Sequence, residues 1–147
     1  MLKKNLFFLM LGLTIGFCAQ AQEWQTDLGK AEKLATAQNK PIILVFQGSD
    51  WCAPCIKLDR EIWSTATFKD YSKDHFVMLK ADFPRSSKNA LATEQQEKNN
   101  QLAATYNPEG YFPLVVVLDD KGKVLGKTGY KHLSPEGYIK TLNAFQH

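Results

Sequence analysis

Residues 42–55 read IILVFQGSDWCAPC, and this stretch sets the expected fold of the chain. Its first five residues form a continuous apolar run, which is typical of a strand buried on both faces of a sheet. Polar loop residues follow, and from Cys52 onward apolar side chains recur at helical spacing as far as Trp63. The stretch therefore predicts a buried strand, a short loop and a helix that begins at a pair of cysteines.

The two cysteines of this stretch are placed for thiol chemistry. A helix N-terminus has unpaired amide N–H groups and the positive end of the helix dipole, and both favour a thiolate. We therefore expect the pKa of Cys52 to lie below the unperturbed value of about 8.5. Cys55, one turn further into the helix, is expected to be less exposed and to resolve a mixed disulfide formed by Cys52. Pro54 stiffens the ring between them and suits the first helical turn.

Other uses of a cysteine pair have less support in the surrounding sequence. A zinc site needs about four ligands, whereas His75, His132 and His147 are scattered along the chain. Covalent haem attachment needs a histidine after the second cysteine, where Ile56 stands instead. A purely structural disulfide stays open, although closing so small a ring removes little chain entropy. We expect no metal and no cofactor.

The N-terminus has the three-part layout of a secretory signal peptide. Residues 1–5 form a short basic head, residues 6–17 carry no charge, and residues 19–21 (AQA) form a small-x-small cleavage site. The apolar run is short for a bilayer span, so a membrane anchor that stays attached is the less favoured alternative. We expect cleavage after residue 21, which leaves residues 22–147 without a stable membrane anchor.

Cleavage changes the charge and the cysteine count of the working protein. The full chain of 147 residues has a formal net charge of +3, and loss of Lys3 and Lys4 lowers it by two. So small a net charge argues against a nucleic-acid partner, because a protein that binds nucleic acid neutralises many phosphates with lysine and arginine side chains. Cys18 leaves with the signal, and a lipoprotein linked through it is disfavoured by the bulky Phe17 before it. The composition, 44% hydrophobic and 22% charged, is that of one globular domain.

The rest of the chain alternates between helical and strand patterns. Two helical crossovers between buried strands indicate a parallel core, and the short turn at 119–122 adds an antiparallel edge strand. The fold class is therefore α/β, with a mixed central sheet (a parallel core plus an antiparallel edge hairpin) flanked by helices. The expected order is helix 24–39, strand 42–46, a helix from 52, strand 76–79, helix 89–106, strands 114–118 and 124–125, and a helix from 135.

Four features of the sequence together resemble a known family. They are the apolar run 43–46, the Trp-Cys-Ala-Pro-Cys sequence at 51–55, Phe112-Pro113 and Gly129. They are similar to the thioredoxin superfamily, and within it to exported thioredoxin-like proteins of Gram-negative bacteria. The resemblance covers nearly all of the chain after the signal peptide. It implies a thioredoxin-like fold and, together with the signal peptide, a periplasmic location.

The resemblance also implies roles for individual residues. Cys52 is the implied nucleophile and Cys55 the resolving thiol. Pro113 is the implied cis-proline that faces the cysteines, and a cis bond before proline costs only about 0.5–1 kcal/mol relative to trans. The backbone at Phe112 would then bind an extended substrate segment by strand-like hydrogen bonds. Trp51 would belong to the docking surface, although packing in the core is the alternative for a tryptophan.

The sequence departs from the family pattern in two places. Cytoplasmic thioredoxins carry a buried aspartate on the strand before the cysteines, which helps to move the proton of the resolving cysteine, and Phe46 stands at that position here. Asp82, at the end of the next strand, is the best-placed substitute, while a solvated charge at a strand end is the competing interpretation. Residues 84–106 are longer than in a minimal thioredoxin, and we expect them to form a solvated helix.

The resemblance favours a periplasmic thiol–disulfide oxidoreductase. Its partners would be client proteins with disulfides or thiols, and a membrane or soluble electron donor. Pro54 is similar to the reducing members of the family rather than to the strong oxidants, so we expect a reductase or an isomerase. A binding or chaperone module without redox turnover is an alternative. A thiol donor for haem or copper assembly is a weaker one.

Overall fold

The computed structural model describes residues 21–147, so the predicted signal peptide, residues 1–21, lies outside them except for Ala21. Within this range no helix has both the length and the apolar character that a bilayer crossing requires. In chain order the elements are β1 (Trp24–Gln25), α1 (Leu28–Gln38), β2 (Ile42–Gln47), α2 (Ala53–Leu58), a π-helical turn (Asp59–Trp63), α3 (Ala66–His75), β3 (Val77–Asp82), a 3-10 turn (Ser87–Asn89), α4 (Thr93–Tyr106), β4 (Leu114–Leu118), β5 (Val124–Thr128) and α5 (Pro135–Ala144).

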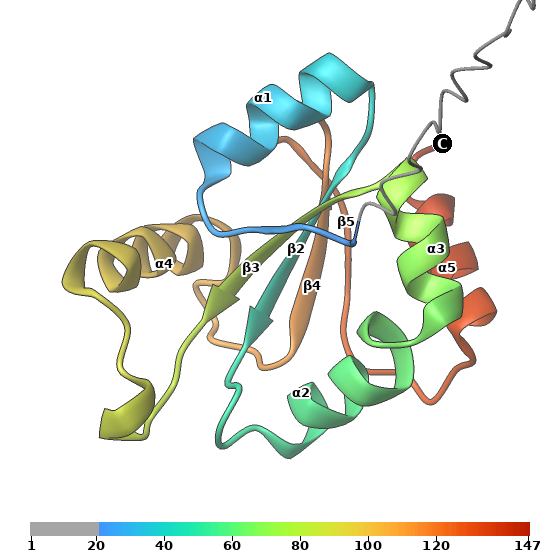
Figure 1. The fold of residues 1–147 in the computed structure, drawn as a ribbon. Helices are drawn as coiled ribbons and strands as arrows, with labels where there is room; N and C mark the ends of the chain where they lie inside the picture. The colour runs from blue at the N-terminus through green and yellow to red at the C-terminus, as the bar shows by residue number, and fades with distance from the viewer. Residues whose placement is uncertain (1–20) are drawn as a thin grey trace, which may run out of the picture.

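In the described residues, five strands form one sheet in the order β1-β3-β2-β4-β5, and helices cover both of its faces (Figure 1). β1, β3 and β2 run parallel to one another, β4 is antiparallel to β2, and β4 and β5 form an antiparallel hairpin. The predicted mixed sheet, flanked by helices and ending in an antiparallel hairpin, is confirmed.

The direction of β4 is the part of this prediction that is wrong. Leu114 pairs with Phe46 and Leu118 with Ile42, so β4 enters the sheet at the end where β2 leaves it. Figure 1 shows α4 lying across the strands rather than along them, so this connection does not carry the chain back to the opposite end of the sheet. A helical connection implies parallel strands only when it makes that return. The periodicity of the sequence indicates a helix but not its direction.

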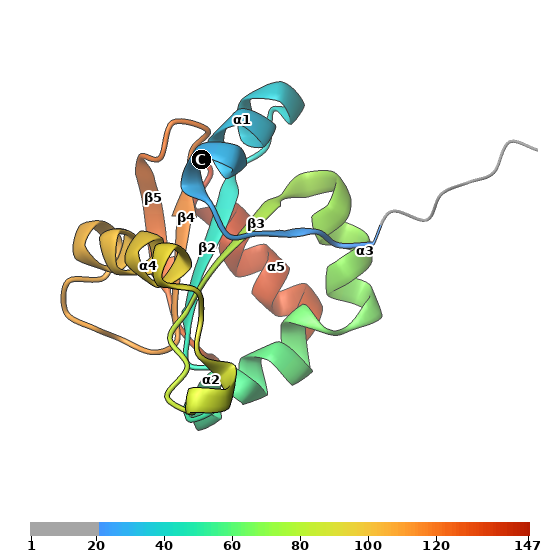
Figure 2. The same cartoon turned by 60° about the vertical axis from the view of Figure 1, so that its left-hand side comes forward.

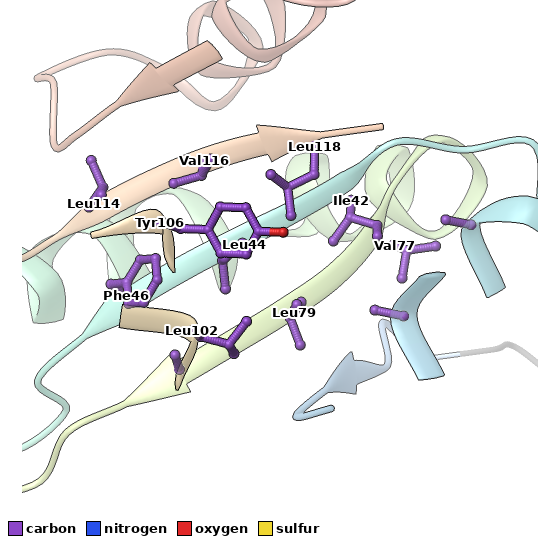
Figure 3. Packing of buried hydrophobic residues seen from close by; sticks show 13 residues of the cluster. Ile42, Leu44, Phe46, Val77, Leu79, Leu102, Tyr106, Leu114, Val116 and Leu118 are labelled. Carbon is purple, nitrogen blue, oxygen red and sulfur yellow. The ribbon is translucent and has the colours of Figure 1, made fainter. Parts of the chain in front are cut away.

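The apolar run of β2 is buried on both faces of the sheet, as predicted. Ile42, Leu44 and Phe46 pack on the face covered by α1 and α4, where Leu102 and Tyr106 of α4 lie over them (Figure 3). All three strand residues are fully buried. Each side chain of this kind contributes roughly 1.5–3 kcal/mol to folding when it is removed from water. Burial therefore holds β2 in place, and β2 leads into residues 48–51, the loop before Cys52, which we call the cysteine loop.

The opposite face of the sheet packs on Trp63, which is 2% exposed. Its ring makes edge-on contacts with Phe68 of α3 and Tyr138 of α5, at centroid distances of 4.7 and 5.3 Å. Figure 2 shows α3 and α5 on the side of the sheet away from α4. Trp63 ends the π-helical turn that follows α2, so this cluster ties the cysteine helix to the core.

Some element boundaries differ from the predicted ones. Trp24–Gln25, expected as the start of a helix, forms β1 against β3, and a strand of two residues is too short to show a period. The helical pattern from Cys52 stops after Trp63, and α3 begins afresh because the Thr65 hydroxyl accepts a hydrogen bond from the Phe68 amide at 3.3 Å. The final helix begins as predicted, with Ser134 as its N-cap residue.

Candidate active site

The cysteines lie at the edge of the sheet where two parallel strands end together. Gln47, the last residue of β2, pairs with Asp82, the last residue of β3. The Phe83 amide then donates to the Gln47 carbonyl at 2.9 Å and extends this pairing. The loops that follow β2 and β3 therefore begin side by side, and Figures 1 and 2 show both at the same end of the molecule.

Cys52 and Cys55 are joined by a disulfide at the start of α2, with their Cα atoms 5.2 Å apart. Cys52 is the N-cap residue, and its Sγ accepts a hydrogen bond from the Cys55 amide at 3.3 Å. Pro54 lies in the first turn of α2, as predicted. The expectation that Cys55 is less exposed than Cys52 is wrong for this oxidised state, since the residues are 4% and 3% exposed.

Trp51 lies beside the disulfide with its ring half-buried. The indole Nε1 donates to the Phe83 carbonyl at 2.7 Å, and the ring meets Phe112 edge-on at a centroid distance of 5.4 Å. A Cβ at Gly48 would overlap the indole, so a glycine is required there for the ring to lie in this place. Trp51 thus lies between the loop after β3 and the segment before β4.

Phe112 and Pro113 lie next to Trp51, at the start of β4. Their peptide bond is cis. Both residues are half-buried and line an open groove of about 360 Å³ together with Tyr111, Thr128 and Gly129. Tyr111 is 62% exposed, and the Thr128 hydroxyl is buried without a hydrogen-bond partner among the described residues. The groove is therefore apolar on the side of Tyr111, Phe112 and Pro113, and Lys127 also lines it.

Asp82 lies at the end of β3, with its carboxylate on the loop before Cys52. One oxygen accepts hydrogen bonds from the amides of Ser49 and Phe83 at 2.9 and 3.0 Å, and the other accepts from the Ser49 hydroxyl at 2.6 Å. Both oxygens are thus engaged in fixing the loop. A part for Asp82 in moving the proton of Cys55 stays a prediction.

Comparisons with known proteins agree with this geometry. The family model described as Thioredoxin-like matches residues 23–120. The chain belongs to the thioredoxin-like family. It is 34% identical over 122 residues to the disulfide bond reductase DsbH of Chlamydia pneumoniae, a match that covers 83% of this chain and 71% of that protein.

Solved structures show the same relationship. A structure described as DsbH oxidoreductase superposes with a TM-score of 0.78 at 32% identity, covering 92% of this chain and 91% of that one. A thioredoxin from Thermus thermophilus superposes with a TM-score of 0.62 at 17% identity, covering 85% and 87% of the two chains. The second likeness concerns the fold alone.

This thioredoxin-like protein is a thiol–disulfide oxidoreductase, and its Cys52–Cys55 pair is spaced as in a Cys-x-x-Cys site, in the sequence Trp-Cys-Ala-Pro-Cys. A dithiol that closes into a disulfide can accept or donate two electrons by exchange with another disulfide. Among residues 21–147, no three His, Cys, Asp or Glu side chains gather as a metal site would require.

A second aspartate, Asp50 in the loop before Cys52, has a role that the sequence pattern does not reveal. The Asp50 carboxylate accepts hydrogen bonds from the amides of Arg85 and Ser86 and from the side chain of Asn89, each at 2.9 Å. These bonds, the Arg85 amide foremost, hold the pKa of Asp50 below its usual value of 3.8. Loop aspartates often accept bonds from turn amides, but usually from neighbours in sequence. Here the partners lie 35 or more residues away, which leaves no local signal.

Proposed function

We propose that this thioredoxin-like protein is a periplasmic disulfide reductase or isomerase that exchanges disulfides with exported client proteins. The observation that carries the proposal is the Cys52–Cys55 disulfide at the start of α2, next to the aromatic surface formed by Trp51 and Phe112. Its likeness to a protein named as a disulfide bond reductase gives independent support.

Cys52 is the proposed attacking residue because it receives the Cys55 amide hydrogen bond at its Sγ. A donor aimed at sulfur stabilises a thiolate more than a thiol, so it favours the reactive form. Ala53 and Pro54, which follow Cys52, are both exposed and leave room for a client to approach. Among residues 21–147 no donor of this kind reaches the Cys55 sulfur, so Cys55 is the proposed second thiol.

The proposed reaction proceeds through a mixed disulfide. The reduced Cys52 thiolate attacks one sulfur of a client disulfide, an S–S bond to the client forms, and the other client sulfur leaves as a thiolate. The Cys55 thiolate then attacks Cys52 Sγ, closes the Cys52–Cys55 disulfide and releases the second client thiolate. Two electrons thus pass to the client, whose thiolates take up protons from water. A dithiol electron donor, membrane-bound or soluble, must reduce the protein again.

The client would lie along the groove at the start of β4. We propose that an extended client segment forms strand-like hydrogen bonds with the backbone at Phe112, with Pro113 beneath it and Trp51 beside it. The contact between the Phe112 and Trp51 rings supports this arrangement, because it joins the groove to the residue that precedes Cys52. The exposed Tyr111 ring would add apolar contact area.

Two features support the proposed direction of electron transfer, towards the client, and the proposed periplasmic location of the protein. Pro54 separates the cysteines at a position where strongly oxidising relatives carry a histidine that stabilises the thiolate, so reduction or isomerisation is favoured. The signal-like layout of residues 1–21, together with likeness to a bacterial Dsb protein, supports export to the periplasm. Alkaline phosphatase fused after residue 30 would test export: activity is expected, and none would contradict it.

The decisive experiment compares Cys52→Ser with Cys55→Ser, both reduced and mixed with a disulfide-containing peptide. Cys55→Ser should accumulate a mixed disulfide that mass spectrometry maps to Cys52, while Cys52→Ser should form none above the rate of free cysteine. Formation of the adduct at Cys55 alone would overturn the assigned roles. A Cys52→Ser variant that still protects unfolded clients from aggregation as well as the unaltered protein would favour a binding module instead.

A further inference from the structure

The loop after β3 is held tightly against the cysteine loop. We call residues 83–89 the clamp segment. It contacts the cysteine loop at two points: the Phe83 carbonyl accepts a hydrogen bond from the Trp51 indole, and the Asp50 carboxylate binds the amides of Arg85 and Ser86. Asn89 completes the grip on Asp50 through its side chain. The backbone at Arg85 is therefore held by hydrogen bonds at its own amide and at Phe83 and Ser86, which lie on either side of it in the sequence.

The Arg85 side chain lies over the face of Trp51. Its guanidinium carbon is 3.7 Å from the centre of the indole ring, at the distance of a close cation–π contact. The faces of a guanidinium carry no N–H groups, so this contact leaves the donors along its edge available to a ligand. The positive charge of Arg85 therefore lies on the side chain of the residue that immediately precedes Cys52.

The charge of Arg85 has no counter-ion within residues 21–147. The ion pairs of this range involve Arg60, Lys73, Lys98 and His132, and none involves Arg85. Two carboxylates that lie where β2 and β3 end have other partners: Asp50 accepts hydrogen bonds from backbone amides of the clamp segment, and Asp82 accepts them from Ser49. Arg85 is therefore a fixed, exposed guanidinium with unused donors.

We infer that Arg85 binds a carboxylate of the client, so that disulfides flanked by Asp or Glu are preferred substrates. A guanidinium edge matches a carboxylate with two parallel N–H···O bonds, which a lysine cannot reproduce. Asp50 acts as a positioning residue, because it holds the backbone from which Arg85 reaches Trp51. The inference rests on the proposed function, since it names the clients of the same dithiol.

The test uses a series of short peptides that share one disulfide and differ in a single flanking residue. Glu, Gln or Lys is placed at each of the three positions on either side of the attacked cysteine. Stopped-flow fluorescence gives the second-order rate constant with reduced protein, so no electron donor is needed. The same peptides are reduced by dithiothreitol, and dividing by that rate removes the intrinsic effect of the flanking charge on the disulfide.

The unaltered protein should react about fivefold faster with the best Glu peptide than with its Gln counterpart, as expected of one exposed ion pair. Arg85→Gln should bring this normalised ratio to one, and Asp50→Asn should lower it because Arg85 loses its anchor. Arg85→Lys should keep part of the ratio. Lys88→Gln, which removes an exposed cation from the same segment, is the matched control and should leave the ratio unchanged. Raising the salt concentration should shrink the ratio for the unaltered protein.

Three outcomes decide between the possibilities. A ratio that falls in Arg85→Gln and not in Lys88→Gln supports the inference. A ratio of one in the unaltered protein, or one that Arg85→Gln leaves in place, overturns it, even if that variant reacts more slowly with every peptide. Failure of the protein to outpace dithiothreitol with any peptide would instead count against the proposed function.

Discussion

The segments that follow β2 and β3 leave the sheet side by side and differ in how they contribute to the site. The first, Gly48–Trp51, leads into the two cysteines and begins a motif that is plain in the sequence. The second, the clamp segment, reads FPRSSKN, a mostly polar sequence without a recognisable motif. In the structure its Arg85 amide donates a hydrogen bond to Asp50 of the first segment, and the Arg85 side chain lies over the ring of Trp51. The reactive groups are thus local in sequence, while the surface that surrounds them is assembled from two segments.

Gly48→Ala should break this arrangement most severely. The new Cβ would overlap the Trp51 indole, which must then move away from Phe112 and the clamp segment. Since small displacements near reacting groups are costly, we expect the rate of client disulfide reduction to fall about 10- to 100-fold. Gly29→Ala is the matched control, because its Cβ meets only Asp27 at an ordinary contact distance of 3.4 Å. Equal rates for the two variants would show that the place of Trp51 does not matter.

Asp82→Asn should loosen the junction between the two segments. It weakens the bonds to the Ser49 amide and hydroxyl, so we expect the free energy of unfolding to fall by about 1–2 kcal/mol in urea titrations. If Asp82 acts only through Ser49, then Ser49→Ala should have little further effect in the Asp82→Asn background. A change in the pH dependence of mixed-disulfide resolution in Asp82→Asn, absent from Ser49→Ala, would assign Asp82 the proton-transfer role instead.

Thr128→Val provides a contrast outside both segments. In the part of the chain that the structure describes, the buried Thr128 hydroxyl has no hydrogen-bond partner, and valine has nearly the same shape without the polar group. Removing an unpaired buried hydroxyl should raise the free energy of unfolding by about 1 kcal/mol. Denaturant titration checks this, with Thr141→Val as the control because its hydroxyl has a partner, the Gly137 carbonyl at 3.0 Å. A loss of stability in Thr128→Val would mean that the hydroxyl is satisfied, for example by water.

The smallest expected effect concerns the titration of Asp50. Its hydrogen bonds to the clamp segment lower its pKa, so its contribution to stability is fully present above the unfolded value and is lost as the pH falls through the folded value. The clamp contact should therefore persist below pH 3.8, the usual value. NMR titration should place the pKa of Asp50 below that value, and Asn89→Ala should raise it. An unshifted pKa in the unaltered protein would mean that the contact does not persist in solution.

The same comparison explains what could be predicted from the sequence. Local patterns predict the strand at 42–46, buried on both faces of the sheet, and the helix after Cys52. The candidate site around Trp51 and Phe112-Pro113 follows from a resemblance that covers nearly all of the chain after the signal peptide. The direction of β4 could not be predicted, because periodicity does not give the orientation of α4. The contact of Asp50 with Arg85 also escapes prediction, because it depends on two strands ending in register.

The central claim is that Cys52 and Cys55 form a reducing dithiol, and their reduction potential tests it most directly. The protein is equilibrated in buffers of oxidised and reduced dithiothreitol, and the reduced fraction is measured by the mass shift on thiol alkylation. We expect a potential near that of thioredoxin, about −270 mV. A potential near that of the strongly oxidising disulfide catalysts, about −120 mV, would contradict it.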